Sequence, residues 1–203
     1  MIKKILIVFS IFLMVGCTSV NINTQTLSEI IDSEIKEQSK SATINNKGYK
    51  YYLPSGFTVS KDNTYIQELL SNGTTYYMNV DIISYYYKNK MSSNHELDDY
   101  EYYTFENKDT NGYLRIRKNN DNFFVELCYN YAIIEVEVKE SELRYAISRG
   151  IMILNSIKYN DSVIEKYIND NDLESSETVY KIPEPENNEA KNVLEYIEEY
   201  EEE

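Results

Sequence analysis

Residues 123–157 read FFVELCYNYAIIEVEVKESELRYAISRGIMILNSI, and within this stretch the hydrophobic period changes from two to about 3.6. Residues 123–129 and 132–139 are rich in β-branched and aromatic side chains and predict two strands joined at Asn130. Apolar residues then recur on one helical face from Ser141, the predicted N-cap, to Ile157. Gly150 lies in this stripe, so we expect a close approach between helix and sheet. The stretch therefore predicts an α+β fold.

The residues before this stretch predict further antiparallel strands joined by short turns. Asn72-Gly73 separates the β-rich runs 65–71 and 74–87, which is the strongest short-range hairpin signal. Asn111-Gly112 is expected to join the runs 100–106 and 113–118, and residues 119–122 to turn into the next strand. Pro54-Ser55-Gly56 predicts an earlier turn, and residues 88–99 read as a polar loop or short helix. Residues 48–160 thus predict a core domain with an antiparallel sheet of about seven or eight strands and one long helix packed on a face.

The N-terminus predicts export. Residues 1–4 carry two positive charges, and residues 5–15 are apolar except for Ser10, which is the pattern of a secretory signal peptide. This apolar run has 11 residues, fewer than the ~20 that a membrane-spanning helix needs. Residues 13–17 resemble the lipobox of bacterial lipoproteins: Leu13, Met14, Val15, Gly16 and Cys17, with Met14 where Leu is usual. The resemblance implies that residues 1–16 are removed and that Cys17 carries a diacylglycerol on the extracytoplasmic face of the cell membrane.

Two polar segments flank the predicted core. Residues 17–47 predict a lipid-anchored tether, in which Thr26 and Glu29 form a capping-box pattern ahead of a short amphipathic helix that either docks on the core or frays. Residues 161–203 predict an acidic tail, since residues 170–203 hold 13 acids against two lysines. Residues 190–200 show a helical stripe, which could bind a basic groove on a partner or remain solvated.

The charge restricts the partners. The formal net charge is −14 and becomes −16 once Lys3 and Lys4 are removed, so we expect no nucleic-acid partner and no attraction to anionic headgroups. The membrane contact would then be made by the acyl chains alone. If lipid occupies Cys17, then Cys128 has no intramolecular partner, and we expect a buried, unreactive thiol in a strand.

The sequence offers no catalytic or metal-binding constellation. His95 is the only histidine and lies in the polar loop, so neither a zinc site nor a Ser-His-Asp triad is predicted, and no cofactor is expected. No phosphate-binding glycine motif occurs. The remaining enzymatic hypothesis is a cell-envelope hydrolase that uses Glu126, Glu135 or Glu137 as acid and base.

Tyrosine is the candidate residue for recognition, because its flat, amphipathic ring suits peptide and glycan contacts. The chain has 21 tyrosines and no tryptophan. We expect one ring of each adjacent pair to face solvent, and we assign four candidate contact residues: Tyr77, Tyr85, Tyr87 and Tyr102. The alternative is that tyrosine only fills half-buried positions on the pleated sheet.

Two motifs carry a family resemblance over roughly residues 48–160. YYLPSGF at residues 51–57 and ILNSIK at residues 153–158 resemble the opening and closing motifs of the PsbP/Mog1-like superfamily, with Phe57 where Trp is usual. The resemblance implies an α+β or αβα binding module without shared catalytic residues. The leading hypothesis is therefore a surface-anchored binding or assembly module for an envelope protein or a glycan; the sequence identifies neither the ligand nor the oligomeric state.

Overall fold

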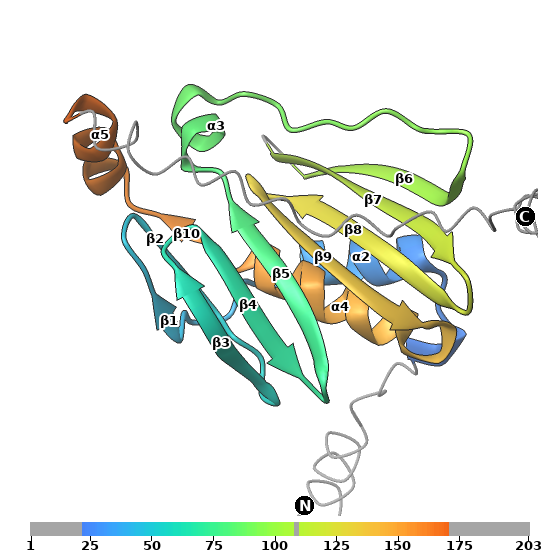
Figure 1. The fold of residues 1–203 in the computed structure, drawn as a ribbon. Helices are drawn as coiled ribbons and strands as arrows, with labels where there is room; N and C mark the ends of the chain where they lie inside the picture. Colours follow the sequence, from blue (N-terminus) through green and yellow to red (C-terminus); the bar gives the residue numbers. More distant parts are fainter. Residues whose placement is uncertain (1–21, 108–109, 171–203) are drawn as a thin grey trace, which may run out of the picture.

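The computed structural model describes residues 22–107 and 110–170. These residues form one large sheet, one small sheet and several helices (Figure 1). The lipobox, Cys17 and the helix predicted at residues 190–200 lie outside the described residues. The elements, in chain order, are η1 (Ile22–Thr24), α2 (Leu27–Lys36), β1 (Ile44–Asn45), β2 (Tyr49–Tyr51), β3 (Phe57–Asn63), β4 (Ile66–Ser71), β5 (Thr74–Val80), α3 (Ile82–Tyr87), β6 (Asp99–Asn107), β7 (Thr110–Asn119), β8 (Asn122–Tyr129), β9 (Ala132–Lys139), α4 (Glu140–Asn155), β10 (Lys158–Tyr159) and α5 (Asp161–Asn169).

The large sheet confirms the predicted α+β class. Its seven strands are antiparallel and lie in the order β3-β4-β5-β9-β8-β7-β6. Two meanders, β3 to β5 and β6 to β9, meet where β5 pairs with β9. The Asn72-Gly73 hairpin is confirmed, with positive φ at both residues, and so are the turns at residues 119–122 and at Asn130.

Helix α4 covers one face of this sheet against β8 and β9. The predicted apolar stripe is buried, and a Cβ on Gly150 would lie 3.0 Å from Leu127 Cδ2, which confirms the close approach. Ser141 is not the N-cap, because β9 runs directly into the helix and Lys139 takes that position.

Helix α2 packs beside α4, so most of the predicted tether belongs to the domain. The capping box is present, with Thr26 N donating to Glu29 Oε2 at 2.8 Å, and this backbone hydrogen bond lowers the pKa of Glu29. Four aliphatic side chains are buried: Leu27, Ile30, Ile31 and Ile35. Ser148 on α4 donates to Glu34 at 2.7 Å. Burial of each aliphatic side chain stabilises the packed helix by about 1.5–3 kcal/mol, so α2 docks on the core and does not fray.

The other face of the sheet is crossed by the connection from β5 to β6. Residues 88–98 follow α3 and contact β7 through Asn111 and Arg115 and β8 through Cys128. Arg115, buried in β7, holds this loop by hydrogen bonds to Ser93 and Asn94 and lies 3.3 Å from Asp99. We call residues 88–98 the covering loop.

The prediction of a strand over residues 74–87 is correct up to Val80 and wrong beyond it. Residues 82–87 form α3, because Asp81 caps the helix through its bond from Ser84 N at 2.8 Å and Lys88 ends it in the left-handed conformation. Tyr85 and Tyr87 therefore lie on a helix, where the alternation expected of a strand does not apply.

The turn predicted at Asn111-Gly112 is also wrong. Both residues lie inside β7, and β6 pairs with β7 up to Asn107 and Thr110. A Cβ on Gly112 would collide with the Cys128 carbonyl and would lie 2.5 Å from the Phe105 ring. Glycine here allows close contact between strands and marks no turn.

The small sheet and α5 form one end of the molecule. Its strands lie in the order β1-β2-β10, so the chain segment before the large sheet pairs with the segment after α4. Residues 161–169, predicted as part of the tail, form α5 with Ile164 buried. No helix of the described residues is long and apolar enough to span a membrane.

Cys128 should be unreactive in the folded protein. The thiol is buried under Met91 of the covering loop, and burial, reinforced by Glu126, raises its pKa to about 12. At pH 8 a chain of residues 17–203 with Cys17→Ser should react with an aromatic disulfide reagent on the order of 10³-fold more slowly when folded than in denaturant, in proportion to the thiolate fractions. Stopped-flow absorbance measures both rates. Equal rates would show that the covering loop leaves the thiol accessible.

Candidate ligand-binding site

The two-residue turn between β8 and β9 fixes this end of the molecule. Asn130 and Tyr131 both have positive φ, which a tight turn between twisted strands requires. The Asn130 side-chain amide donates to the carbonyls of Leu154 at 3.2 Å and Ile157 at 2.9 Å, where α4 ends. The Tyr159 hydroxyl donates to the Asn130 carbonyl at 2.7 Å. The turn thus ties α4 and β10 to the large sheet.

Helix α3 joins the same cluster through Tyr85. The Tyr85 ring stacks on Tyr159 with centroids 3.8 Å apart and meets Tyr131 edge-on. Its hydroxyl donates to Asp161 Oδ1 at 2.7 Å, which joins α3 to the first residue of α5. Burial, together with this bond, raises the pKa of Tyr85 to about 12. The phenol therefore stays protonated and can donate to the carboxylate at neutral pH.

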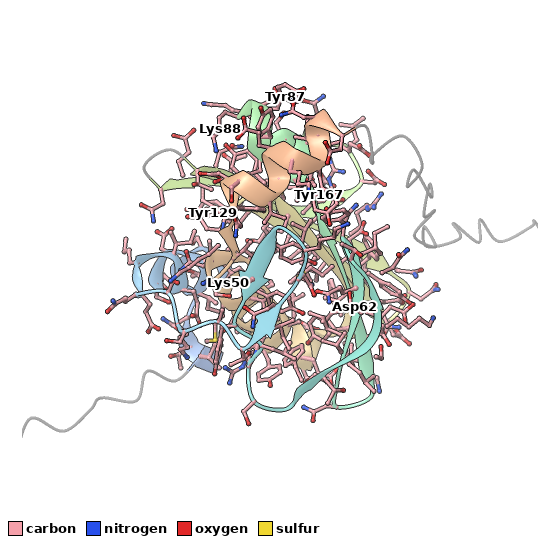
Figure 2. The ribbon with its side chains drawn as sticks, turned by 90° about the vertical axis from the view of Figure 1, so that its left-hand side faces the viewer. Lys50, Asp62, Tyr87, Lys88, Tyr129 and Tyr167 are labelled. Carbon is pink, nitrogen blue, oxygen red and sulfur yellow. The ribbon has the colours of Figure 1, made fainter. Side chains whose placement is uncertain are left out.

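The turn between β1 and β2 receives α5 at Gly48. Gly48 has φ +92°, and a Cβ there would lie 3.1 Å from Ile164 Cγ1. The Gly48 carbonyl accepts from Asn160 N at 2.8 Å. Lys47 places its ammonium 3.6 Å from the centre of the Tyr167 ring. These contacts hold α5 against the hairpin of β1 and β2. Figure 2 shows both elements from this side, with Tyr167 labelled on α5.

A pocket of about 730 Å³ lies between the small sheet and α5. Three segments line it: the β1–β2 hairpin, β10 and the start of α5. The lining residues are Asn45, Asn46, Lys47, Gly48, Tyr49, Lys50, Lys158, Tyr159, Asn160, Asp161, Ser162 and Val163. We call it the hairpin pocket.

The hairpin pocket is lined by more positive than negative side chains. Lys47, Lys50 and Lys158 are exposed, and Asp161 is the carboxylate among the lining residues. Lys50 lies directly opposite Lys158 in the register and next to Asn45 on β1. This row crosses the small sheet on the side opposite to the buried Tyr49.

The phenols beside this row serve as internal hydrogen-bonding groups. Tyr49 donates to the Thr64 carbonyl at 2.5 Å and accepts from Asn46 Nδ2 at 2.8 Å. Burial raises the pKa of Tyr49 and of Tyr159 above the usual value for tyrosine. Both phenols are therefore neutral at physiological pH and fix the small sheet in place.

None of the four predicted contact tyrosines lines the hairpin pocket, although Tyr85 contacts two residues that do, Tyr159 and Asp161. Tyr77 lies half-buried on the open face of β5, opposite Glu68 and Glu135. Tyr85 belongs to the cluster with Tyr159, and Tyr87 is 59% exposed on α3. Tyr102 donates to the Ser93 carbonyl at 2.5 Å under the covering loop.

The carboxylates of the hydrolase hypothesis lie on the large sheet, away from the hairpin pocket. Glu126 and Glu135 are directly opposite each other on β8 and β9. Glu126 accepts from the Tyr113 hydroxyl at 2.5 Å, and Glu137 is exposed and accepts from the Asn122 amide at 2.9 Å. His95 is exposed beside Tyr102, and no cluster of metal-ligating side chains occurs among the described residues.

Sequence reasoning missed the residues of the hairpin pocket. Asn45 to Lys47 were assigned to the tether, although an Asn-Lys-Gly run is typical of a turn. The helix signal of α5 was also present, since Asn160 is a favoured N-cap ahead of the apolar stripe that includes Val163, Ile164 and Tyr167.

Comparisons with known proteins do not assign this chain to a family. No family model, curated protein or solved structure matches the chain. The resemblance to the PsbP/Mog1-like superfamily stays a prediction.

Replacing Gly48 with alanine should loosen α5. Gly48→Ala and Gly56→Ala both add a Cβ at positive φ, +92° and +89°, but only the Gly48 Cβ meets a neighbour within 4 Å. The strain common to both variants costs about 1–2 kcal/mol of unfolding free energy, and Gly48→Ala should lose more because Ile164 must shift. Urea unfolding measures the difference. Hydrogen exchange of the α5 amides should accelerate in Gly48→Ala alone; unchanged exchange would mean that α5 does not depend on this contact.

Proposed function

We propose that this protein is a lipoprotein, anchored to the extracytoplasmic face of the cell membrane through a diacylglycerol on Cys17, and that it acts there as a binding module. The observation that supports binding is the hairpin pocket. Its volume of about 730 Å³ falls within the ~300–1,000 Å³ of typical ligand sites. Its lining offers amide and ammonium groups that donate hydrogen bonds.

The build of the site also supports a binding role. Two stretches distant in sequence, residues 45–50 and 158–163, converge on the hairpin pocket and are held by Gly48, Asn130 and Tyr159. A site fixed by neighbouring hydrogen bonds loses little conformational entropy when it binds a ligand. The partner of such a module would be an envelope protein or a glycan.

Carboxylate catalysis gains no support from the described residues. Acid and base carboxylates act as a pair across a cleft that holds the substrate. Glu126 and Glu135 are instead cross-strand neighbours in the same sheet. Glu126 accepts from Tyr113 and lies 3.7 Å from the Arg115 guanidinium, and Glu137 is solvent-exposed. The binding role is therefore the one that we propose.

The anchor is tested by replacing each cysteine in the full-length chain. The wild type should sediment with membranes and carry an acyl mass increment on a new N-terminus at Cys17. Cys17→Ala should lose that increment, whereas Cys128→Ala should behave as the wild type because Cys128 is buried. Fractionation and intact-mass measurement give the answer. Acylation that persists in Cys17→Ala contradicts the proposed anchor.

The binding role is tested by filling the hairpin pocket. Asn45 lines the pocket on β1, and Thr58 is an exposed strand residue on β3 outside it, so Asn45→Trp and Thr58→Trp form a matched pair. Immobilised residues 17–203 should retain a component of an envelope extract, and Asn45→Trp should reduce its recovery about tenfold or more by occluding the site. Thr58→Trp should leave recovery unchanged. Quantitative mass spectrometry compares the three samples, and equal recovery from Asn45→Trp would place binding elsewhere.

A further inference from the structure

The charge arrangement of the hairpin pocket narrows the class of ligand. Lys50 and Lys158 are directly opposite on paired antiparallel strands. Opposite residues have Cβ atoms about 4.5–5.5 Å apart, and like charges in such a pair destabilise the sheet. Each of these strands is short, three residues in β2 and two in β10, so little pairing offsets the repulsion.

No carboxylate neutralises this pair among the described residues. The ion pairs of residues 22–107 and 110–170 involve Lys61 and Arg115 and leave out all three pocket lysines. Asp161, at the pocket wall, accepts from the neutral Tyr85 hydroxyl and keeps its negative charge. Three lysines and one aspartate therefore leave the lining with net positive charge.

This local charge is opposite to that of the whole chain. The protein has 34 acidic and 20 basic residues, yet three lysines and one aspartate line the pocket. Salt screens exposed charges beyond about 8 Å at physiological ionic strength, so the nearby lysines determine the potential that a bound group meets. An anion would relieve the repulsion between Lys50 and Lys158.

The neighbouring polar groups fit a tetrahedral oxyanion. Lysine provides a point charge with three donors and commonly binds phosphate. The lining as a whole, with three ammonium groups and one carboxylate, matches the charge of a phosphate better than that of a single carboxylate. The Asn45 amide, in the same row, adds further donors.

We infer that the hairpin pocket binds a phosphate group between Lys50 and Lys158. The inference rests on the proposed binding function and names its ligand class. The phosphate could belong to a soluble phosphorylated molecule or to a lipid headgroup, and the two share this chemistry.

The test uses variants that should keep or raise the unfolding temperature of the free protein but reduce its stabilisation by phosphate. In residues 17–203, Lys50→Gln and Lys158→Gln remove the like-charge contact, so without phosphate each should unfold at the same temperature as the wild type or slightly higher. Millimolar pyrophosphate should raise the Tm of the wild type by about 2–4 °C, as expected when the pyrophosphate concentration is well above the Kd. Both variants should lose most of this rise. Lys90→Gln, an exposed lysine outside the pocket, should respond as the wild type does.

Calorimetric titration then measures affinity and separates the sources of phosphate. Pyrophosphate, glycerol phosphate and vesicles containing phosphatidylglycerol are the three probes, with sodium chloride matched for ionic strength. Each pocket lysine should contribute about tenfold or more to the Kd of the probe that binds. Binding of the soluble probes assigns a soluble ligand, and binding of the vesicles alone assigns a headgroup.

The inference is overturned if no probe binds, or if Lys50→Gln and Lys90→Gln respond alike. A ligand that Asn45→Trp excludes from the pocket while all phosphate probes fail would leave the binding function standing and remove only the phosphate assignment.

Discussion

The hydrogen bonds around the Asn130–Tyr131 turn are the constraint on which the rest of this structure depends. An aromatic residue at φ 59° is costly, and it persists because the Tyr159 hydroxyl donates to the Asn130 carbonyl at 2.7 Å and the Asp81 N–H donates to the Tyr131 carbonyl at 2.9 Å. The same turn caps the end of α4 through the Asn130 amide. One two-residue turn therefore sets where the helix layer ends and where β10 begins. The position of the hairpin pocket follows from that.

The two faces of the large sheet explain why the candidate site lies at the end of the molecule. Helices α2 and α4 bury one face, and the covering loop, held by Arg115, closes the other over β7 and β8. The remaining open strands present Glu135 and Glu137, together with Glu68, which pairs with Lys61 at 2.8 Å. The pocket is different because the small sheet places two lysines opposite each other.

Much of the fold follows from sequence periodicity, and the errors have definable causes. The α4 stripe and the Asn72-Gly73 hairpin were predictable because each depends on local spacing. Residues 82–87 have β propensity, but they form a helix because the Asp81 side chain caps its N-terminus. The Asn111-Gly112 pair predicts a turn, whereas a close contact with the Cys128 carbonyl on the neighbouring strand requires glycine there. The hairpin pocket joins residues more than 100 positions apart, so no local pattern could predict it.

Docking of α2 changes how an anchored domain would sit on a bilayer. A tether of ~30 flexible residues would span about 30 Å, but the chain is packed from Ile22 onward, and five residues can reach at most ~18 Å from Cys17. Arg144, in the first half of α4, donates to the Gln25 carbonyl near this entry point, whereas β10 follows the far end of α4. The 16 residues of α4 extend about 24 Å. A lipid on Cys17 would thus hold the entry end of the domain at the membrane and direct the hairpin pocket away from it, which favours a soluble phosphorylated ligand over a headgroup.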